Sequence, residues 1–484
     1  MQPLDDLKTE TDSSTGEVRV CPSCGHVNPS DGSERCNGCW VPLTGVGAVS
    51  QMEGELMIRR RRNKLLGRKL VLRSLPLGLA VVLIVWGMVV TFDLRPKPAQ
   101  AVSGLNPSVA AENWALARRT PDNSGFTPSV APVPQQVQWT FATTETLTSA
   151  PAVVDGRVYL STGGGRTVAL DQASGQLLWE YHTGLSSDST PAVAGDMVIA
   201  AFTPGLIVAL DRNTGATRWK IDLDQPIFSS PILAEGTLYF GAGDWKLHAL
   251  DAATGKERWV FVTEDWIVSP VAYADGTVVV ASQDSHVYLL DADSGRQRLM
   301  FDTGFQRFGG GPAIHGDTVY FSSDRGWLWA IDRRAKSYPG QRKLWRVKIN
   351  LYVWQVISSR PNQPGGLWSK RVGGELQGLL AIANDTVYGA TEQGKVFARD
   401  AITGNKRWST RLSVEISTAP TVAGNTVLVG SKNGTIFGLD ARTGDVLWDF
   451  NVSHEEIVDS PIVAGNIIYV VSADGTLYAL SGAQ

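Results

Sequence analysis

ALDQASGQLLW at residues 169–179 returns as ALDRNTGATRW at 209–219, as ALDAATGKERW at 249–259 and as GLDARTGDVLW at 438–448. The aspartate recurs every forty residues at Asp171, Asp211, Asp251 and Asp291, and the series continues with Asp332, Asp400 and Asp440. Aspartate accepts hydrogen bonds from the backbone amides that follow it, and the glycine four residues later tolerates a positive φ. The stretch therefore predicts a tight turn that is repeated along the chain.

Runs rich in β-branched and aromatic residues flank these turns, such as TVVVAS at 277–282 and TVYFSS at 318–323. A repeat near forty residues with four such runs predicts one four-stranded antiparallel blade of a β-propeller. The first three strands occur eight times, and the last unit lacks its fourth strand. QVQWTFAT at 136–143, with Trp139 in the slot that other units give to tryptophan, supplies the missing strand. The sequence thus predicts an all-β, eight-bladed propeller closed by its N-terminal strand.

These repeats resemble the quinoprotein (PQQ-like) propeller repeat from residue 114 to the C-terminus. The resemblance implies one of two functions, because the family contains calcium-containing, quinone-dependent alcohol dehydrogenases and also a non-enzymatic lipoprotein that assists outer-membrane protein assembly. Its dehydrogenases typically hold PQQ between a tryptophan and a disulfide of adjacent cysteines. No cysteine follows Cys39 in this chain. We therefore expect neither PQQ nor calcium, and a binding protein in place of an enzyme.

The four cysteines all lie near the N-terminus, in CPSCGHVNPSDGSERCNGCW at 21–40. Two Cys-x-x-Cys pairs supply four thiolates, a ligand set that suits tetrahedral Zn²⁺. The alternatives are two disulfides, which need an oxidising compartment, and a redox pair, which belongs in a βαβ unit. The stretch resembles small zinc ribbons of the CPxCG…CxxCG type, although Trp40 stands where that family usually has glycine. We predict a structural zinc bound by Cys21, Cys24, Cys36 and Cys39.

An uncharged apolar segment at 74–92 is long enough, at about 1.5 Å per residue, to cross a bilayer as a helix. Eight basic residues lie within 59–73, and the positive-inside rule then places the N-terminus in the cytoplasm and the remainder outside it. A signal peptide cleaved after Ala101 is the alternative. We expect a single-pass cell-membrane protein of the bacterial envelope with an uncleaved anchor.

The expected organisation follows from these features: a disordered acidic tail at 1–20, a zinc ribbon at 21–44, a basic linker at 45–73, the span at 74–92, a second linker at 93–113 and the propeller at 114–484.

Some tryptophans of the chain occupy a repeated position in the last strand of a blade, and others lie outside that position. Seven tryptophans fit the recurrent slot, where we expect them to dock one blade on the next: Trp139, Trp179, Trp219, Trp259, Trp345, Trp408 and Trp448. Six others lie between 245 and 368. Trp329 takes a strand position that holds tyrosine or phenylalanine in other units, and two of the remaining five fall in a long interval at 350–376. That interval is expected between the fifth and sixth blades, on the face of the blade-to-blade loops. The candidate ligand-binding residues are Trp245, Trp266, Trp327, Trp354, Arg360 and Trp368. The alternative is that these side chains only pack the inserted loop onto the propeller.

A membrane-anchored scaffold fits these features best: the exported propeller binds a protein or another ligand, and the zinc ribbon meets a cytosolic partner. The alternatives are a PQQ-dependent oxidoreductase and a transmembrane sensor that links the propeller to the zinc module. The net charge of −3 gives no electrostatic argument for nucleic acid.

Overall fold

The computed structural model describes residues 16–60 and 105–482, apart from positions 305, 309, 339 and 360. The chain divides into two compact units, Met1–Lys97 and Pro98–Gln484. Among the described residues no helix is both long and apolar enough to cross a membrane, and the segment expected to do so, 74–92, lies outside them.

The first unit is a small sheet with the strand order β2-β1-β3. Its strands are β1 (Glu17–Val20), β2 (Val27–Pro29) and β3 (Val49–Ser50), and residues 51–60 are helical. Its buried hydrophobic cluster consists of Cys21, Cys36 and Leu43. So small a core supplies little folding free energy by itself.

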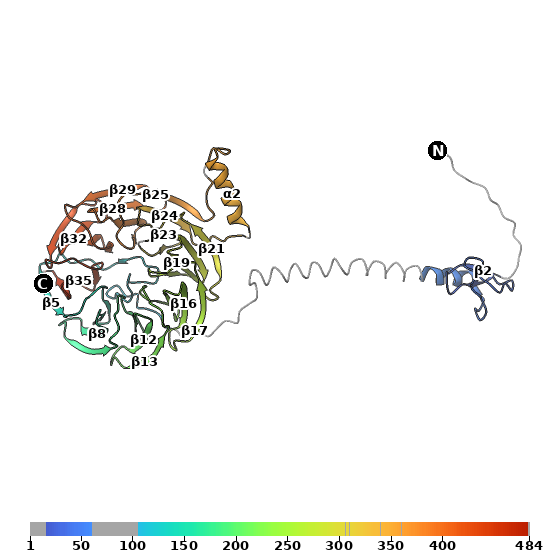
Figure 1. Ribbon diagram of the computed structural model, residues 1–484, viewed down its shortest axis with the longest axis horizontal. Helices are drawn as coiled ribbons and strands as arrows, with labels where there is room; N and C mark the ends of the chain where they lie inside the picture. The colour runs from blue at the N-terminus through green and yellow to red at the C-terminus, as the bar shows by residue number, and fades with distance from the viewer. Residues whose placement is uncertain are drawn as a thin grey trace. The chain divides into compact units, whose positions relative to one another are not determined.

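The second unit is a ring of eight four-stranded antiparallel blades, as Figure 1 shows. Blade 1 contains β6 (Ala152–Val154), β7 (Arg157–Ser161), β8 (Arg166–Asp171) and β9 (Leu177–His182). Blade 2 contains β10 (Ala192–Ala194), β11 (Met197–Phe202), β12 (Leu206–Asp211) and β13 (Thr217–Asp222). Blade 3 contains β14 (Ile232–Ala234), β15 (Thr237–Gly241), β16 (Lys246–Asp251) and β17 (Glu257–Val262). Blade 4 contains β18 (Ala272–Ala274), β19 (Thr277–Ser282), β20 (His286–Asp291) and β21 (Gln297–Asp302).

The second half of the ring repeats this order with one insertion. Blade 5 contains β22 (Ala313–His315), β23 (Thr318–Ser322), β24 (Trp327–Asp332) and β25 (Gly366–Arg371), and the helix α2 (Gln341–Val353) precedes β25. Blade 6 contains β26 (Ala381–Ala383), β27 (Thr386–Ala390), β28 (Lys395–Asp400) and β29 (Lys406–Arg411). Blade 7 contains β30 (Thr421–Ala423), β31 (Thr426–Gly430), β32 (Thr435–Asp440) and β33 (Val446–Asn451), and β4 (Phe126–Thr127) adds to it in parallel. Blade 8 contains β34 (Ile462–Ala464), β35 (Ile467–Ser472) and β36 (Thr476–Ser481).

The N-terminal strand closes the ring. β5 (Gln136–Ala142) pairs antiparallel with the C-terminal β36 and completes blade 8, with Trp139 opposite Ala479. This confirms the predicted eight-bladed propeller and its closure. Because β36 is paired with β5, blade 8 has the same four strands as the other blades and the two ends of the chain close the ring.

The repeated turn fixes the contact between neighbouring blades. In the first repeat, Asp171 accepts hydrogen bonds from the amide and hydroxyl of Ser174, and Gly175 has a φ of 71°. The indole of Trp139 lies against that glycine so closely that an added Cβ would come within 2.6 Å of it. Trp139 Nε1 also donates to the carbonyl of Gln172 at 3.0 Å. Glycine is therefore required here both by the positive φ and by the neighbouring indole.

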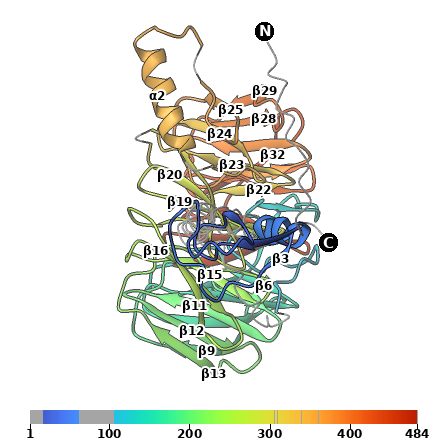
Figure 2. The same cartoon turned by 90° about the vertical axis from the view of Figure 1, so that its right-hand side faces the viewer.

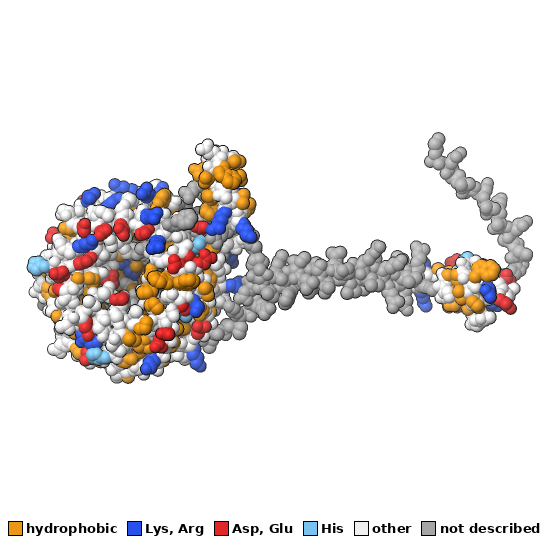
Figure 3. Space-filling model, viewed as in Figure 1, with side chains coloured by type: hydrophobic (Ala, Val, Ile, Leu, Met, Phe, Trp, Pro, Cys, Tyr) orange, Lys and Arg blue, Asp and Glu red, His pale blue; other side chains and the backbone are white. Residues whose placement is uncertain are grey.

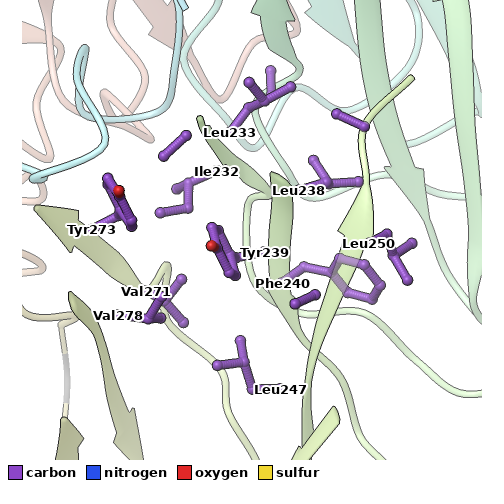
Figure 4. Packing of buried hydrophobic residues seen from close by; sticks show 14 of the residues in the cluster. Ile232, Leu233, Leu238, Tyr239, Phe240, Leu247, Leu250, Val271, Tyr273 and Val278 are labelled. Atoms are coloured by element: carbon purple, nitrogen blue, oxygen red, sulfur yellow. The ribbon is translucent and has the colours of Figure 1, made fainter. Parts of the chain in front are cut away.

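The same docking recurs around the ring, always with a donor and acceptor 33 residues apart. The further docking tryptophans with this bond are Trp179, Trp219, Trp259, Trp368 and Trp408. Apolar side chains behind each turn fill the gap between blades. Figure 4 shows this packing between blades 3 and 4, where the rings of Tyr239 and Tyr273 stack at 6.1 Å.

The long interval, expected between blades 5 and 6, does not lie there. The insertion lies inside blade 5, between β24 and β25, in place of the repeated turn: Asp332 N donates to Gly365 O, as Asp171 N donates to Gln176 O in blade 1. It therefore begins at the end of the blades that carries the turns, opposite the blade-to-blade loops. Trp345 lies in α2, and Trp368 occupies the docking slot that we had assigned to Trp345. Trp368 is thus a repeat tryptophan, because the extra residues precede it.

Residues 114–125, which precede the ring, run along the first strands of the blades. Backbone bonds join Trp114 to Val153 of blade 1, and further bonds join the segment to blades 2, 4, 5, 6 and 7. Arg118 is buried in it and donates to the carbonyl of Pro420 at 2.7 Å and to Ser460 Oγ at 3.2 Å. Burial lowers the pKa of Arg118 to about 10, although the negative charge of Asp459 acts to raise it. The ordered fold of this unit also includes 105–113, which we had expected to be linker: Leu105 O accepts a bond from Gly236 N.

Candidate functional site

The four cysteines form one cluster in the first unit. Cys21 follows β1, and the turns after Cys21 and Cys36 have the same geometry: each cysteine amide bonds to the carbonyl five residues on, and its carbonyl accepts from the amide four residues on. The Sγ atoms of Cys21 and Cys39 are 3.6 Å apart, and those of Cys24 and Cys36 are 3.5 Å apart. All four ligand atoms lie within 4.8 Å of one another, a group that could hold a metal ion.

The surroundings favour the thiolate form of one ligand. Burial alone would raise the pKa of Cys36, but hydrogen bonds from the Gly38 amide and the Asn28 side chain oppose this, and the pKa is lowered to about 6. Thiolate is the form of cysteine that binds metals.

Trp40 stands at the position in the second turn that Gly25 holds in the first. Both residues have a positive φ, 59° for Trp40 and 79° for Gly25, and the Trp40 side chain is exposed. A left-handed backbone is unfavourable for a side chain other than glycine. The departure from the ribbon pattern is therefore a strained position.

On the propeller, exposed apolar side chains gather at the blade-to-blade loops around blade 3. We call Phe228, Trp245, Val262 and Trp266 the blade-3 patch. The rings of Phe228 and Trp266 are 5.7 Å apart, and Trp245 O accepts bonds from the Thr263 amide and hydroxyl. Trp245 and Trp266 are each about half exposed, at 49% and 48%. Figure 3 shows hydrophobic side chains on the ring where β16 and β17 lie in Figure 1.

The loops that carry this patch and the loops next to them in blades 2 to 4 also hold six acidic residues at the same end of the blades: Asp222, Asp224, Asp244, Glu264, Asp265 and Asp284. Lys246 is a basic neighbour of Asp244. Four of the acidic residues have partners within the fold: Asp244 lies 3.2 Å from His248 Nε2, Asp284 accepts a bond from the Tyr288 hydroxyl at 2.7 Å, and Asp222 and Asp265 each accept a bond from a backbone amide of their own loop. The patch therefore presents an apolar centre with an acidic rim.

The predicted site residues do not all come together. Trp245 and Trp266 share the blade-3 patch. Trp327 and Trp368 instead line one pocket of about 390 Å³, together with Trp329 and Trp345. Trp354 follows α2 and is 71% exposed. Arg360 lies outside the described residues.

The sequence analysis missed Phe228: the equivalent loop position holds Thr148 in blade 1 and Asp188 in blade 2 but an apolar Val268 in blade 4, so an apolar residue in this slot gave no clear signal.

Comparisons with known proteins agree with this architecture. The family model described as outer membrane protein assembly factor BamB matches residues 129–232, 204–335 and 342–484. The crystal structure of BamB from Moraxella catarrhalis is 19% identical, covers 72% of this chain and 97% of its own, and superposes with a TM-score of 0.57. Quinohemoprotein alcohol dehydrogenase from Comamonas testosteroni is 14% identical over 77% of this chain and 81% of its own, with a TM-score of 0.60. At these identities the two structures show a shared fold alone. No curated protein matches the chain.

Proposed function

The chain belongs to the family described as outer membrane protein assembly factor BamB, and on that premise we propose that it is a membrane-anchored, extracytoplasmic scaffold whose propeller binds a protein partner. The observation that carries this proposal is the blade-3 patch, an exposed aromatic cluster on a rigid closed ring.

The composition of the patch favours a protein over a small ligand. Tryptophan dominates the binding energy of many protein interfaces, and its half-exposed indoles become fully buried when a partner covers them. Phe228, Trp245 and Trp266 come from three separate loops that closed blades hold in place, so little ordering is needed on binding. The acidic rim calls for a partner whose apolar contact is bordered by basic residues.

We place the propeller outside the cytoplasm because of the basic run at 59–73 and the apolar segment at 74–92. Reporter fusions after Gly67 and after Gln484 test this. Cytoplasmic and exported signals, respectively, are expected, and two signals on the same side would contradict the orientation. A mature protein that starts at Val102 would show instead that the anchor is cleaved.

For the N-terminal unit we propose a structural Zn²⁺ held by Cys21, Cys24, Cys36 and Cys39. A tetrahedral site with Zn–S bonds of about 2.3 Å has sulfur atoms about 3.8 Å apart. The separations of 3.5 and 3.6 Å fit this geometry. Four thiolates leave no coordination position for a substrate, so the site stabilises the module and presents its surface to a cytosolic partner.

Capture of the partner tests the binding proposal. The propeller unit, 98–484, is immobilised and exposed to solubilised envelope proteins, and the double variant Trp245→Ser/Trp266→Ser is compared with it. Loss of one hot-spot tryptophan costs about 2 kcal/mol or roughly 30-fold in affinity, so the double variant should retain no partner. The matched control, Ile402→Ser/Val446→Ser, removes two exposed apolar side chains elsewhere and should capture normally. Equal loss in both variants would contradict a site at the patch.

A further inference from the structure

The helix α2 carries an exposed apolar stripe. Leu344, Val347, Leu351 and Trp354 follow one another at spacings of three or four residues, and therefore lie on one side of the helix. Leu344 is 57% exposed and Val347 is 54% exposed. Figure 1 and Figure 2 show α2 projecting from the ring beside β24 and β25.

The side of α2 that carries Trp345 packs on the propeller, and this is not the side that carries the stripe. Trp345 Nε1 donates to the Pro361 carbonyl at 3.4 Å, and Trp345 lines the pocket together with Trp327 and Trp329. Trp345 lies about 100° to 180° around the helix axis from the members of the stripe, since successive helical residues are 100° apart. The stripe is therefore not the side by which the helix packs on its own propeller.

The insertion is also strongly basic. Residues 333–365 contain eight Lys and Arg and neither Asp nor Glu, whereas the rest of the chain has 36 basic against 47 acidic residues. Lys343, Arg346 and Lys348 are exposed on α2. Among the described side chains, Arg346 approaches a carboxylate, at 3.5 Å from Asp302. Figure 3 shows hydrophobic side chains over α2 with Lys and Arg near its base.

We propose that α2 is a membrane-docking helix that lies on the surface of a bilayer containing anionic lipid. Tryptophan and aliphatic side chains on one side, combined with flanking Lys and Arg, are the features of helices that bind in the membrane interface. The positive charge favours anionic headgroups, and the stripe inserts at the boundary with the acyl chains. The acidic blade-3 patch, at the other end of the blades, is left free for a protein partner.

The attachment of the chain supports a lipid occupant. Leu105 bonds to Gly236 in the β14–β15 turn, which lies at the end of the blades from which the insertion grows. Only residues 93–104 separate that point from the predicted span, and twelve residues reach at most about 40 Å. A bilayer is thus always within reach of this face of the propeller. This step rests on the anchoring in the proposed function, whereas the lipid affinity of α2 does not.

Vesicle flotation of the propeller unit tests the proposal. The unit has its own closed ring and its own buried cores, and the predicted anchor is absent from it, so any binding reports the propeller itself. Vesicles of phosphatidylglycerol with phosphatidylcholine should bind the unit, and pure phosphatidylcholine should bind it far less. Each basic side chain near an anionic surface strengthens binding roughly fivefold. Lys343→Gln/Arg346→Gln/Lys348→Gln should therefore reduce partitioning on the order of a hundredfold.

A second variant separates insertion from charge. Leu344→Gln/Val347→Gln/Trp354→Gln keeps every charge and should lose binding even to anionic vesicles. The control Ile402→Gln/Val446→Gln/Leu447→Gln removes exposed apolar residues from other blades and should bind like the native unit. Because the unit contains no cysteine, Val347→Cys on the stripe provides a single site for an environment-sensitive dye, whose emission should shift to the blue on anionic vesicles.

Two outcomes would overturn the proposal. One is equal binding by the native unit and the apolar-stripe variant. The other is no vesicle binding together with dimers in sedimentation that the apolar-stripe variant abolishes, which would assign α2 to a second copy of the chain. Neither outcome affects partner capture at the blade-3 patch, so failure here is distinguishable from failure of the proposed scaffold.

Discussion

Trp368→Ala tests the placement of the insertion, because it is expected to destabilise the propeller whereas Trp354→Ala is not. Trp368 lies against Gly404 of blade 6, contacts the Tyr320 ring at 6.0 Å and donates from Nε1 to Ala401 O at 2.9 Å. Trp354 makes no such contact with a blade among the described residues and is 71% exposed.

The magnitude follows from burial. Truncation of a buried tryptophan to alanine costs about 3–5 kcal/mol. Trp368 is only partly buried, and Ala401 O keeps a second donor in the Tyr320 hydroxyl, so we take the lower end, about 3 kcal/mol. With an unfolding entropy of about 2.1 cal/mol/K per residue, a propeller of roughly 380 residues should lose about 4 °C in Tm.

Calorimetry of the propeller unit measures this difference directly. Trp179→Ala serves as the positive control, because Trp179 has the same bond to Arg212 O at 3.0 Å. Trp354→Ala should shift Tm by less than about 1 °C, as exposed substitutions usually do. A Trp368→Ala shift as small as that of Trp354→Ala would refute the docking role of Trp368.

Three further predictions concern the metal, the turns and the strained tryptophan. Elemental analysis should find one zinc per chain in a 16–60 fragment kept reduced and none after Cys36→Ser, and a chelator should unfold the native fragment; zinc retained by the variant would exclude the site. The propeller should lose thermal stability as pH falls from about 4 to 2, because the turn carboxylates have lowered pKa values in the fold, about 2 for Asp211 through its bond to Arg218 and for Asp400 through its bond to Arg407. A carboxylate whose pKa is lower in the folded than in the unfolded protein stabilises the fold at any pH above its unfolded-state pKa, and this stabilisation is lost as the pH falls through its folded-state pKa. A Tm that stays unchanged across this range would contradict the prediction. Trp40→Gly should stabilise the zinc module by about 1 kcal/mol in thermal unfolding, because glycine adopts a φ near 59° without strain.

The ring was predictable because each repeat specifies its own turn and its own interface. Asp171, Gly175 and Trp179 sit at fixed spacings, and the chemistry of each is local to one blade or shared with the next. Closure was predictable for the same reason. The surplus strand before blade 1 has the pattern of a fourth blade strand, and the fourth strand is the one that blade 8 lacks.

The insertion was misplaced because we assigned the first tryptophan after Asp332 to the docking slot. The spacing to the following blade gives the correct answer: Trp179 precedes Gly215 by 36 residues, and Trp368 precedes Gly404 by 36. The partner of a docking tryptophan lies in the next blade, so the register has to be counted forward from the tryptophan and not from the preceding aspartate.

The blade-3 patch was only partly predictable. Trp245 and Trp266 were found as departures from the repeat, but their neighbour Phe228 comes from the loop of a different blade. The buried Arg118 gave no signal, because its partners Pro420 and Ser460 are about three hundred residues away and follow no repeat. Contacts across the ring depend on closure in space, which a linear pattern does not contain.

The most direct test of the central claim is photo-crosslinking in the native cell from the blade-3 patch. A benzophenone amino acid in place of Trp266 in the full chain should give one discrete protein adduct, and Phe228→Ser/Trp245→Ser in the same chain should abolish it. The same probe in place of Ile402, which is exposed in a turn at the other end of the blades, should give none. No adduct from position 266, or equal adducts from 266 and 402, would contradict a scaffold that binds its protein partner through this patch.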